Sequence, residues 1–277
     1  MELIALGFAA ALAGCDVASE PKPAARLLSG GRPAAAAAGG AAATTATTTM
    51  PVTTTTPRLA RIPDPHPGSP QVFWHAATQT QQIALTIDDG FCQPCVEAYV
   101  DFAHRTGIHI TFNPNGIYQE YWNPFASVLE PLITAGQIQI SNHTYSHADL
   151  TRLGSTGIND ELERNDEWIR STFGITTRPW YRPPYGYRNA WSDDAAAEFG
   201  YTHVLMWNGS FGDAALLTPS ELMAQAQLWL KPGTVMLGHA NHPTVINLLG
   251  QIQDLIESRQ LDPVTLDEMF GTSRATG

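Results

Sequence analysis

Carboxylate and imidazole side chains occur in two short segments whose composition suits a divalent metal site. Asp88 and Asp89 are adjacent and follow the apolar run Ile83–Leu85, while His143 and His147 lie four positions apart. One carboxylate and two imidazoles form a three-ligand set that leaves a coordination position open for water. The second carboxylate can then act as a base beside that water. These residues predict metal-assisted hydrolysis.

Short apolar segments alternate with amphipathic segments after residue 80, which predicts strands separated by helices. Strands are expected at 83–87, 108–112, 138–140, 180–181, 203–207 and 234–237, and helices at about 96–105, 125–135, 160–173, 193–199, 220–230 and 244–258. Such alternation is typical of an α/β fold with parallel strands and outer helices. We therefore expect a single distorted (β/α) barrel, closed or nearly closed.

The reactive side chains follow the ends of these expected strands. Asp88 and Asp89, His143, Arg182 and His239 each come at or just after the last strand residue. In a barrel of parallel strands the carboxyl ends meet on one face, and that face carries the active site. We expect the five side chains to lie close together there.

The first residues have the pattern of an export signal. Leu3–Gly14 is apolar but too short to span a bilayer. It ends in Leu12–Cys15, which resembles the lipobox of bacterial lipoproteins, so residues 1–15 are interpreted as a signal peptide and Cys15 as the lipidated residue. The alternatives are an ordinary secretory signal or a buried apolar segment. The acidic Glu2 departs from the lipoprotein pattern, because signal peptides usually begin with a basic region.

Composition divides the rest of the chain. Residues 16–69 are rich in Ala, Thr and Pro and indicate a flexible tether, 70–272 indicate one folded domain, and 273–277 a short tail. The formal charge is −11 with only 15 Lys and Arg. Nucleic acid is therefore excluded as a partner, and membrane contact is expected only through the lipid anchor. The sequence does not indicate an oligomeric state.

Cys92 and Cys95 form a C-x-x-C pair after the first carboxylates. In an exported protein a local disulfide is the favoured interpretation. A zinc ligand pair would need partners from elsewhere in the chain, and a redox-active pair at the start of a helix is the remaining alternative.

Together the motifs resemble those of the NodB-homology polysaccharide deacetylases, carbohydrate esterase family 4. Thr86–Gly90 resembles the family's first motif, His143–His147 the second, Arg182–Tyr185 the third and Leu237–His239 the fifth. The fourth departs from the family pattern: in Trp207–Ala214, Asp213 keeps the position of the orienting Asp, but Ser210 replaces the first Asp and Ala214 the Trp. The resemblance covers about residues 72–270.

The resemblance implies a role for each matching residue. Asp89, His143 and His147 would hold a divalent metal, with Zn²⁺ the best match and Co²⁺ or Ni²⁺ also suited. Asp88 would be the general base and Arg182 its charge partner. The backbone N–H of Tyr185 would stabilise the oxyanion, His239 would act as general acid oriented by Asp213, and Leu237 would contact the acetyl methyl group.

Aromatic residues near the strand ends are candidates for stacking on sugar rings. Trp207 or Phe211 could take the place of the missing Trp as a groove wall, and the further candidates are Trp180, Tyr187 and Trp191.

The resemblance implies an exported hydrolase that removes acetyl groups from N-acetylated amino sugars of an envelope or extracellular polysaccharide. Two alternatives stay open at this point. One is hydrolysis of an O-acetyl ester or of a small amide or imide on the same fold. The other is a carbohydrate-binding lipoprotein without activity, which the altered fourth motif suggests.

Overall fold

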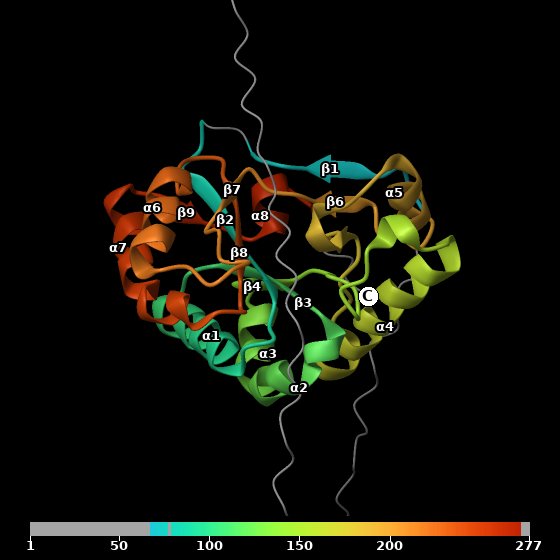
Figure 1. Ribbon diagram of the computed structural model, residues 1–277, viewed down its shortest axis with the longest axis horizontal. Helices are drawn as coiled ribbons and strands as arrows, with labels where there is room; N and C mark the ends of the chain where they lie inside the picture. The colour runs from blue at the N-terminus through green and yellow to red at the C-terminus, as the bar shows by residue number, and fades with distance from the viewer. Residues whose placement is uncertain (1–66, 77–78, 273–277) are drawn as a thin grey trace, which may run out of the picture. The chain divides into compact units, whose positions relative to one another are not determined.

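The computed structural model describes residues 67–76 and 79–272 (Figure 1). The proposed signal peptide with Cys15, nearly all of the proposed tether, and the tail lie outside the described residues. Among the described residues, no helix has both the length and the apolar character needed to cross a membrane.

The described part alternates strands with helices. The strands are β1 (Gln71–Phe73), β2 (Gln82–Asp89), β3 (Ile110–Pro114), β4 (Ile138–Ile140), β5 (Trp180–Tyr181), β6 (His203–Leu205), β7 (Gly209–Ser210), β8 (Val235–His239) and β9 (Asp262–Pro263). The α-helices are α1 (Gln93–Thr106), α2 (Gln119–Trp122), α3 (Ala126–Thr134), α4 (Ser155–Phe173), α5 (Ala190–Ala197), α6 (Pro219–Trp229), α7 (Leu249–Ser258) and α8 (Leu266–Phe270). Short 3₁₀ turns occupy Gly116–Tyr118, Asn123–Phe125, Leu150–Arg152, Pro184–Gly186 and Pro243–Asn247.

The strands form two parallel sheets joined into one curved wall. The order in the larger sheet is β4-β3-β2-β8-β7, with β9 also on β2, and the smaller sheet has the order β1-β6-β5. A parallel bridge between Asn142 and Tyr181 continues the larger sheet into β5, and an antiparallel bridge links His75 with Thr234. The helices pack around the outside (Figure 1). The expected parallel α/β fold with outer helices is confirmed.

Strand β2 lies at the centre of the larger sheet, paired with β3 and β8, and its apolar run is buried throughout. Side chains alternate between the two faces of a strand. Ile83, Leu85 and Ile87 belong to the large core cluster that also contains residues of α1 and α7. Thr86 and Asp88 point to the opposite face, and both contact Arg182, which follows β5 of the smaller sheet. The alternation therefore aims Thr86 and Asp88 into the barrel.

All six expected strands are present, but several elements differ from the sequence-based expectation. β1, β7 and β9, of two or three residues each, were not expected from the sequence. Helix α4 begins at Ser155 rather than near residue 160, and the helix expected at 244–258 is split into the 3₁₀ turn Pro243–Asn247 and α7. The helical turns between Gly116 and Phe125 were not expected from the sequence.

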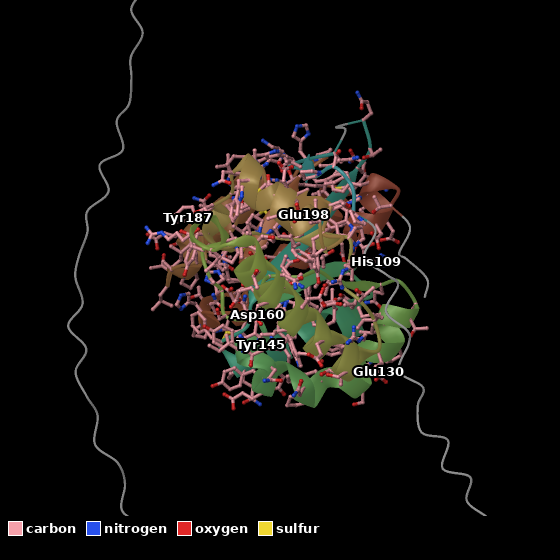
Figure 2. The ribbon with its side chains drawn as sticks, turned by 90° about the vertical axis from the view of Figure 1, so that its right-hand side faces the viewer. His109, Glu130, Tyr145, Asp160, Tyr187 and Glu198 are labelled. Atoms are coloured by element: carbon pink, nitrogen blue, oxygen red, sulfur yellow. A yellow bond between two sulfur atoms is a disulfide. The ribbon has the colours of Figure 1, made fainter. Side chains whose placement is uncertain are left out.

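The carboxyl ends of the strands and their amino ends lie at opposite sides of the domain. Figure 2 shows Tyr187, which follows β5, at one edge, and His109, which precedes β3, at the other. Asp89, His143 and His239 lie at the carboxyl-end side, because they end or follow β2, β4 and β8.

Gly90 connects β2 to α1 in a conformation that only glycine adopts readily. Its φ is +116°, and a Cβ atom at this position would lie 2.1 Å from Nε1 of Trp122. The Trp122 indole donates a hydrogen bond of 3.0 Å to the carbonyl of Asp89. Gly90 and Trp122 together therefore fix the backbone that carries Asp89.

Replacement of Gly90 by alanine should lower the free energy of unfolding by about 2–4 kcal/mol, because backbone strain adds to the overlap with Trp122. Gly136→Ala is a matched control, since Gly136 also has positive φ (+81°) but nothing within 4 Å of the added atom. Urea unfolding of the two variants measures the difference. Equal losses would show that the contact with Trp122 carries no penalty.

Candidate active site

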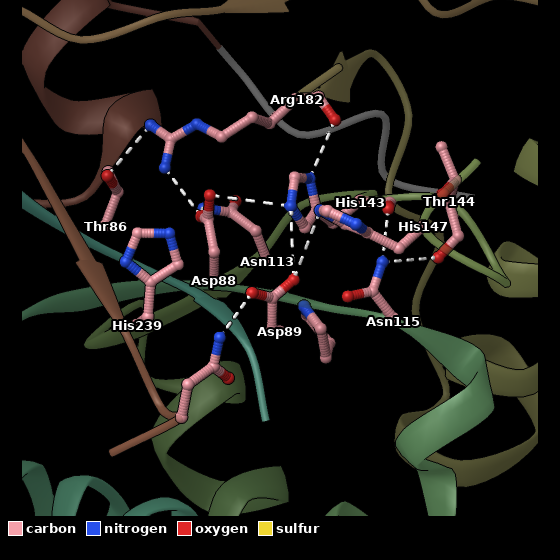
Figure 3. Close-up of polar contacts among 12 residues, drawn as sticks. Thr86, Asp88, Asp89, Asn113, Asn115, His143, Thr144, His147, Arg182 and His239 are labelled. Carbon is pink, nitrogen blue, oxygen red and sulfur yellow. Dashed lines mark hydrogen bonds and ion pairs between the residues drawn. The ribbon is translucent and has the colours of Figure 1, made fainter. Parts of the chain in front are cut away.

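Asp88 is buried at the end of β2 and is held by two donors on one oxygen (Figure 3). Its Oδ1 accepts hydrogen bonds from Nη1 of Arg182 at 2.6 Å and from Nδ2 of Asn113 at 2.7 Å. The fully buried guanidinium of Arg182 also donates through Nη2 to Oγ1 of Thr86 at 2.9 Å. These two donors occupy Oδ1 of Asp88 and leave Oδ2 outside both hydrogen bonds.

Asp89 differs from Asp88 in both conformation and partners. Its φ of +67° turns its carboxylate toward the same pocket, although adjacent strand residues normally face opposite ways. Oδ2 accepts a 2.7 Å hydrogen bond from Asn241, whereas the buried Oδ1 has no hydrogen-bond donor. Burial by itself would raise the pKa of Asp89, but the contact with His143 and the charge of His147 hold it well below its ordinary value.

The two imidazoles direct nitrogen atoms at the free oxygen of Asp89. Nε2 of His143 lies 3.4 Å from Oδ1 of Asp89, and Nε2 of His147 lies 3.6 Å from it. Nδ1 of His143 lies 2.9 Å from the carbonyl of Arg182 and must donate to it, because a carbonyl only accepts. In the neutral ring Nε2 therefore carries the lone pair.

The two imidazoles differ in the direction of their pKa shifts. Burial favours neutral His143, yet Asp88 and Asp89 outweigh it and raise the pKa of His143. Burial lowers the pKa of His147 to about 4, and His143 adds to that effect. His147 is thus unprotonated at neutral pH.

Ligand atoms of Asp89, His143 and His147 all lie within 4.8 Å of one another. Two imidazole nitrogens and one carboxylate oxygen are donors that Zn²⁺ binds at about 2.0–2.2 Å in tetrahedral sites with an open position. Oδ1 of Asp89 supports this fit, because it is buried without a hydrogen-bond donor, whereas buried carboxylate oxygens normally have one. The residues present therefore suit a divalent metal.

Asparagine side chains hold the backbone of the histidine segment. Thr144 and His147 have positive φ values of 68° and 61°, which are unfavourable for residues with a Cβ atom. Nδ2 of Asn115 donates to the carbonyls of His143 and Thr144, and Oδ1 of Asn142 accepts from the Thr144 N–H at 2.9 Å. These bonds hold the strained backbone at Thr144, directly after His143.

His239 ends β8 and faces the pocket. Its Nδ1 lies 2.9 Å from Oδ1 of Asp213, and its backbone N–H donates to Oδ2 of the same carboxylate at 3.0 Å. Burial alone would lower the pKa of His239, but the hydrogen bond to Asp213 and the charge of Asp88 raise it. Nε2 is left for a ligand in the pocket. His242 lies against Phe91 and does not line the pocket.

A pocket of about 400 Å³ opens over these groups. It is lined by the carboxylates and histidines together with Phe91, Tyr118, Pro183, Tyr185, Gly186, Trp207, Ala214, Leu237 and Asn241. Tyr185 adopts a φ of 62°, and Trp207 lies at the wall where a Trp at position 214 is absent. Phe211, the alternative wall residue, is buried instead against Gly238.

The other aromatic candidates do not line this pocket. Trp180 is buried in the core against Phe73, which excludes it as a sugar platform. Tyr187 is exposed and packs against Tyr185 with 5.5 Å between ring centroids, and Trp191 is exposed at the start of α5. Cys92 and Cys95 form a disulfide at the start of α1, as expected for a local pair.

The sequence reasoning missed several residues that contact the site. Asn113 at the end of β3 holds Asp88, and Asn241 after β8 holds Asp89. Asn113 follows the expected strand 108–112 directly, so the strand-end criterion that selected Asp88 would have selected it too. Asn241 gave no such signal, because its role arises from the 2.7 Å contact between segments 152 residues apart.

Replacing Asn241 by alanine should weaken Zn²⁺ binding by about 10- to 100-fold, because the ligand Asp89 loses the donor that orients it. Titration of the apoprotein with Zn²⁺ against a competing chelator measures this directly. Asn113→Ala is the matched control, since it removes an equal donor from Asp88, which is not in the proposed ligand set. Equal affinities of the two variants would contradict the orienting role of Asn241.

Comparison with known proteins gives a consistent result. The polysaccharide deacetylase family matches residues 75–204. A chitin deacetylase of Arthroderma benhamiae is 31% identical over 70% of this chain and 53% of its own length. A chitin deacetylase of Pestalotiopsis is 30% identical over 72% of this chain and 67% of its own length. The chain thus spans about half of the first relative and two thirds of the second.

Solved structures agree on the fold. The crystal structure of a peptidoglycan N-acetylglucosamine deacetylase superposes with a TM-score of 0.65, covering 73% of this chain and 94% of that chain at 22% identity. The resemblance inferred from the motifs is confirmed: the chain belongs to the polysaccharide deacetylases of the NodB-homology type, carbohydrate esterase family 4.

Proposed function

We propose that this chain is a metal-dependent deacetylase that hydrolyses the N-acetyl group of amino sugars in an envelope or extracellular polysaccharide. The observation that carries the proposal is that Asp88 and His239 line the same pocket as the candidate metal ligands Asp89, His143 and His147. Asp88 is held by the buried Arg182, and His239 by the buried Asp213. The names of the relatives, chitin deacetylase and peptidoglycan N-acetylglucosamine deacetylase, support this substrate class.

A divalent metal held by Asp89, His143 and His147 would act as a Lewis acid toward the acetyl carbonyl oxygen. Asp88 takes the proton of the attacking water through Oδ2, because Oδ1 is already occupied by Arg182 and Asn113. The ion pair with Arg182 and the hydrogen bond from Asn113 hold the carboxylate in place for that step. Asp88 is thus the general base of the proposed reaction.

The amine that leaves must be protonated as the carbon–nitrogen bond breaks, because an amine anion is a very poor leaving group. His239 supplies this proton from Nε2, while Asp213 holds Nδ1 and stabilises the imidazolium. The backbone N–H of Tyr185 is the proposed donor to the developing oxyanion, and Leu237 lines the pocket for the acetyl methyl group. Trp207 would replace the missing Trp as the wall of the substrate groove.

We further propose that the protein is exported and held at the cell envelope by lipid on Cys15, with residues 16–69 as the tether. The resemblance of Leu12–Cys15 to a lipobox supports the anchor. The disulfide between Cys92 and Cys95 supports an oxidising compartment.

The purified chain should release acetate from peptidoglycan or N-acetylglucosamine oligomers with Zn²⁺ present, and should lose this activity with a chelator. Acetate is measured in a coupled assay at matched protein concentration. Release from an acetylated xylan alone would favour the O-acetyl esterase alternative. Glycan binding without acetate release at any metal loading would favour the binding lipoprotein that the altered Ala214 suggests.

Two variants separate the proposed roles within that experiment. Asp88→Asn should lower turnover by about 10²–10⁴-fold while retaining bound metal, because only the base is lost. His143→Ala should lose both metal and activity, because it removes a ligand. Full activity of Asp88→Asn would contradict the proposed mechanism.

The alkaline limb of the pH profile should report His239. The hydrogen bond to Asp213 raises the pKa of His239, so the acid form persists to higher pH than for a free imidazole. In Asp213→Asn this effect is lost, and the alkaline limb of kcat/KM should move to lower pH. Asp101→Asn, an equal charge change on exposed α1, is the control. An unmoved limb in Asp213→Asn would exclude His239 as the titrating acid.

A further inference from the structure

The two histidines of the proposed ligand set are oriented in different ways. The ring of His143 is fixed through Nδ1, which donates to the carbonyl of Arg182 at 2.9 Å (Figure 3). The ring of His147 makes edge-on contacts with the rings of His143 and Tyr185. Within the described part of the chain, no hydrogen bond fixes the His147 ring. A ligand histidine needs a fixed ring direction, so that of His147 depends on its backbone.

A carboxylate of helix α4 holds the backbone directly before His147. Glu161 accepts the backbone N–H of Ser146 on Oε2 at 2.8 Å and the Ser146 hydroxyl on Oε1 at 2.7 Å. The main-chain carbonyl of Glu161 also accepts the N–H of Tyr145 at 3.0 Å. Glu161 is only 8% exposed, so water competes little for these hydrogen bonds. One residue of α4 therefore binds two consecutive residues between the proposed ligands.

Other residues of α4 contact the same segment. The guanidinium carbon of Arg164 lies 4.0 Å from the centre of the Tyr145 ring, a cation–π contact. The carbonyl of Leu162 accepts a hydrogen bond of 2.9 Å from Nδ2 of Asn142, which precedes the first histidine. Nδ2 of Asn165 donates to Oδ1 of the same asparagine at 3.0 Å. The start and the middle of the histidine segment therefore pack against one helix.

The backbone at His147 needs such support. Its φ of 61° is unfavourable for a residue with a Cβ atom, and a strained conformation persists only where surrounding contacts hold it. The two hydrogen bonds to the Glu161 side chain lie one residue before the strained position. Hydrogen bonds to a carboxylate are stronger than those between neutral groups. Without them the backbone at His147 can relax, which would turn Nε2 away from Asp89.

We propose that Glu161 is a positioning residue of the metal site, which holds Ser146 so that the next residue, His147, directs Nε2 at the metal. This inference rests on the proposed function and deepens it, because it names a residue outside the ligand set that controls the metal affinity. Nε2 of His147 lies 3.6 Å from Oδ1 of Asp89 in the arrangement that Glu161 supports. Glu161 itself contacts neither substrate nor metal in this role.

The test is the Zn²⁺ affinity of the full chain, titrated from the metal-free state against a competing chelator. Glu161→Ala removes both acceptors for Ser146 and should weaken Zn²⁺ binding by about 10- to 100-fold. Glu161→Gln should keep the affinity within about threefold, because its amide oxygen accepts the Ser146 N–H while its NH₂ donates to the hydroxyl. Glu167→Ala is the matched control, since Glu167 is exposed on the same helix.

An unchanged affinity in Glu161→Ala, or an equal loss in Glu161→Gln, would overturn the positioning role. Ser146→Ala tests the same contact at an exposed position if Glu161→Ala does not fold, and should weaken binding by about threefold.

Amide hydrogen exchange at residues 145–147 of the metal-free protein keeps the inference distinct from the proposed function. Faster exchange in Glu161→Ala than in Glu167→Ala supports the positioning role even if no acetate is released. Equal exchange in the two variants overturns it even if the enzyme is active.

Discussion

Arg182 carries a charged guanidinium where no solvent reaches it, and Asp88 supplies the opposite charge at 2.6 Å. Breaking such a buried pair by removing one partner typically costs about 3–5 kcal/mol, so each residue requires the other. The same residue reaches the proposed metal site through its backbone, because its carbonyl accepts from Nδ1 of His143. Its N–H bonds to the carbonyl of Asn142. Arg182 thus orients both the proposed base and a proposed ligand.

Two carboxylates that are adjacent in the chain have different hydrogen-bond partners in the pocket. Asp88 keeps the strand conformation and points into the barrel, where Arg182 and Asn113 occupy one oxygen. Asp89 ends the strand with a positive φ. Asn241 donates to Oδ2 of Asp89, whereas Oδ1 has no hydrogen-bond donor. Different partners therefore suit Asp88 to its proposed role as base and Asp89 to its proposed role as metal ligand. This division accounts for the strained backbone at Asp89 and for the tight contact of Gly90 with Trp122.

Much of the fold could be predicted because the strands that matter have a strong local signal. The apolar run of β2 and the short alternating β4 are visible in the sequence, and the rule that parallel strands carry their active site at the carboxyl ends selected Asp88, His143, Arg182 and His239 together. β1, β7 and β9 were missed because pairing, rather than periodicity, makes them strands. The helical turns after Gly116 likewise depend on packing.

Residue type and order along the chain determined the chemistry: two carboxylates, two imidazoles, an arginine and a further histidine at successive strand ends. These were readable because the acid–base and ligand properties of a side chain are local. Tertiary structure decided which further side chains contact the carboxylates and the pocket. It placed Asn241 on Asp89, buried Phe211 in the core, and left Phe91 exposed at the pocket. Such choices depend on contacts between distant segments, which no local pattern encodes.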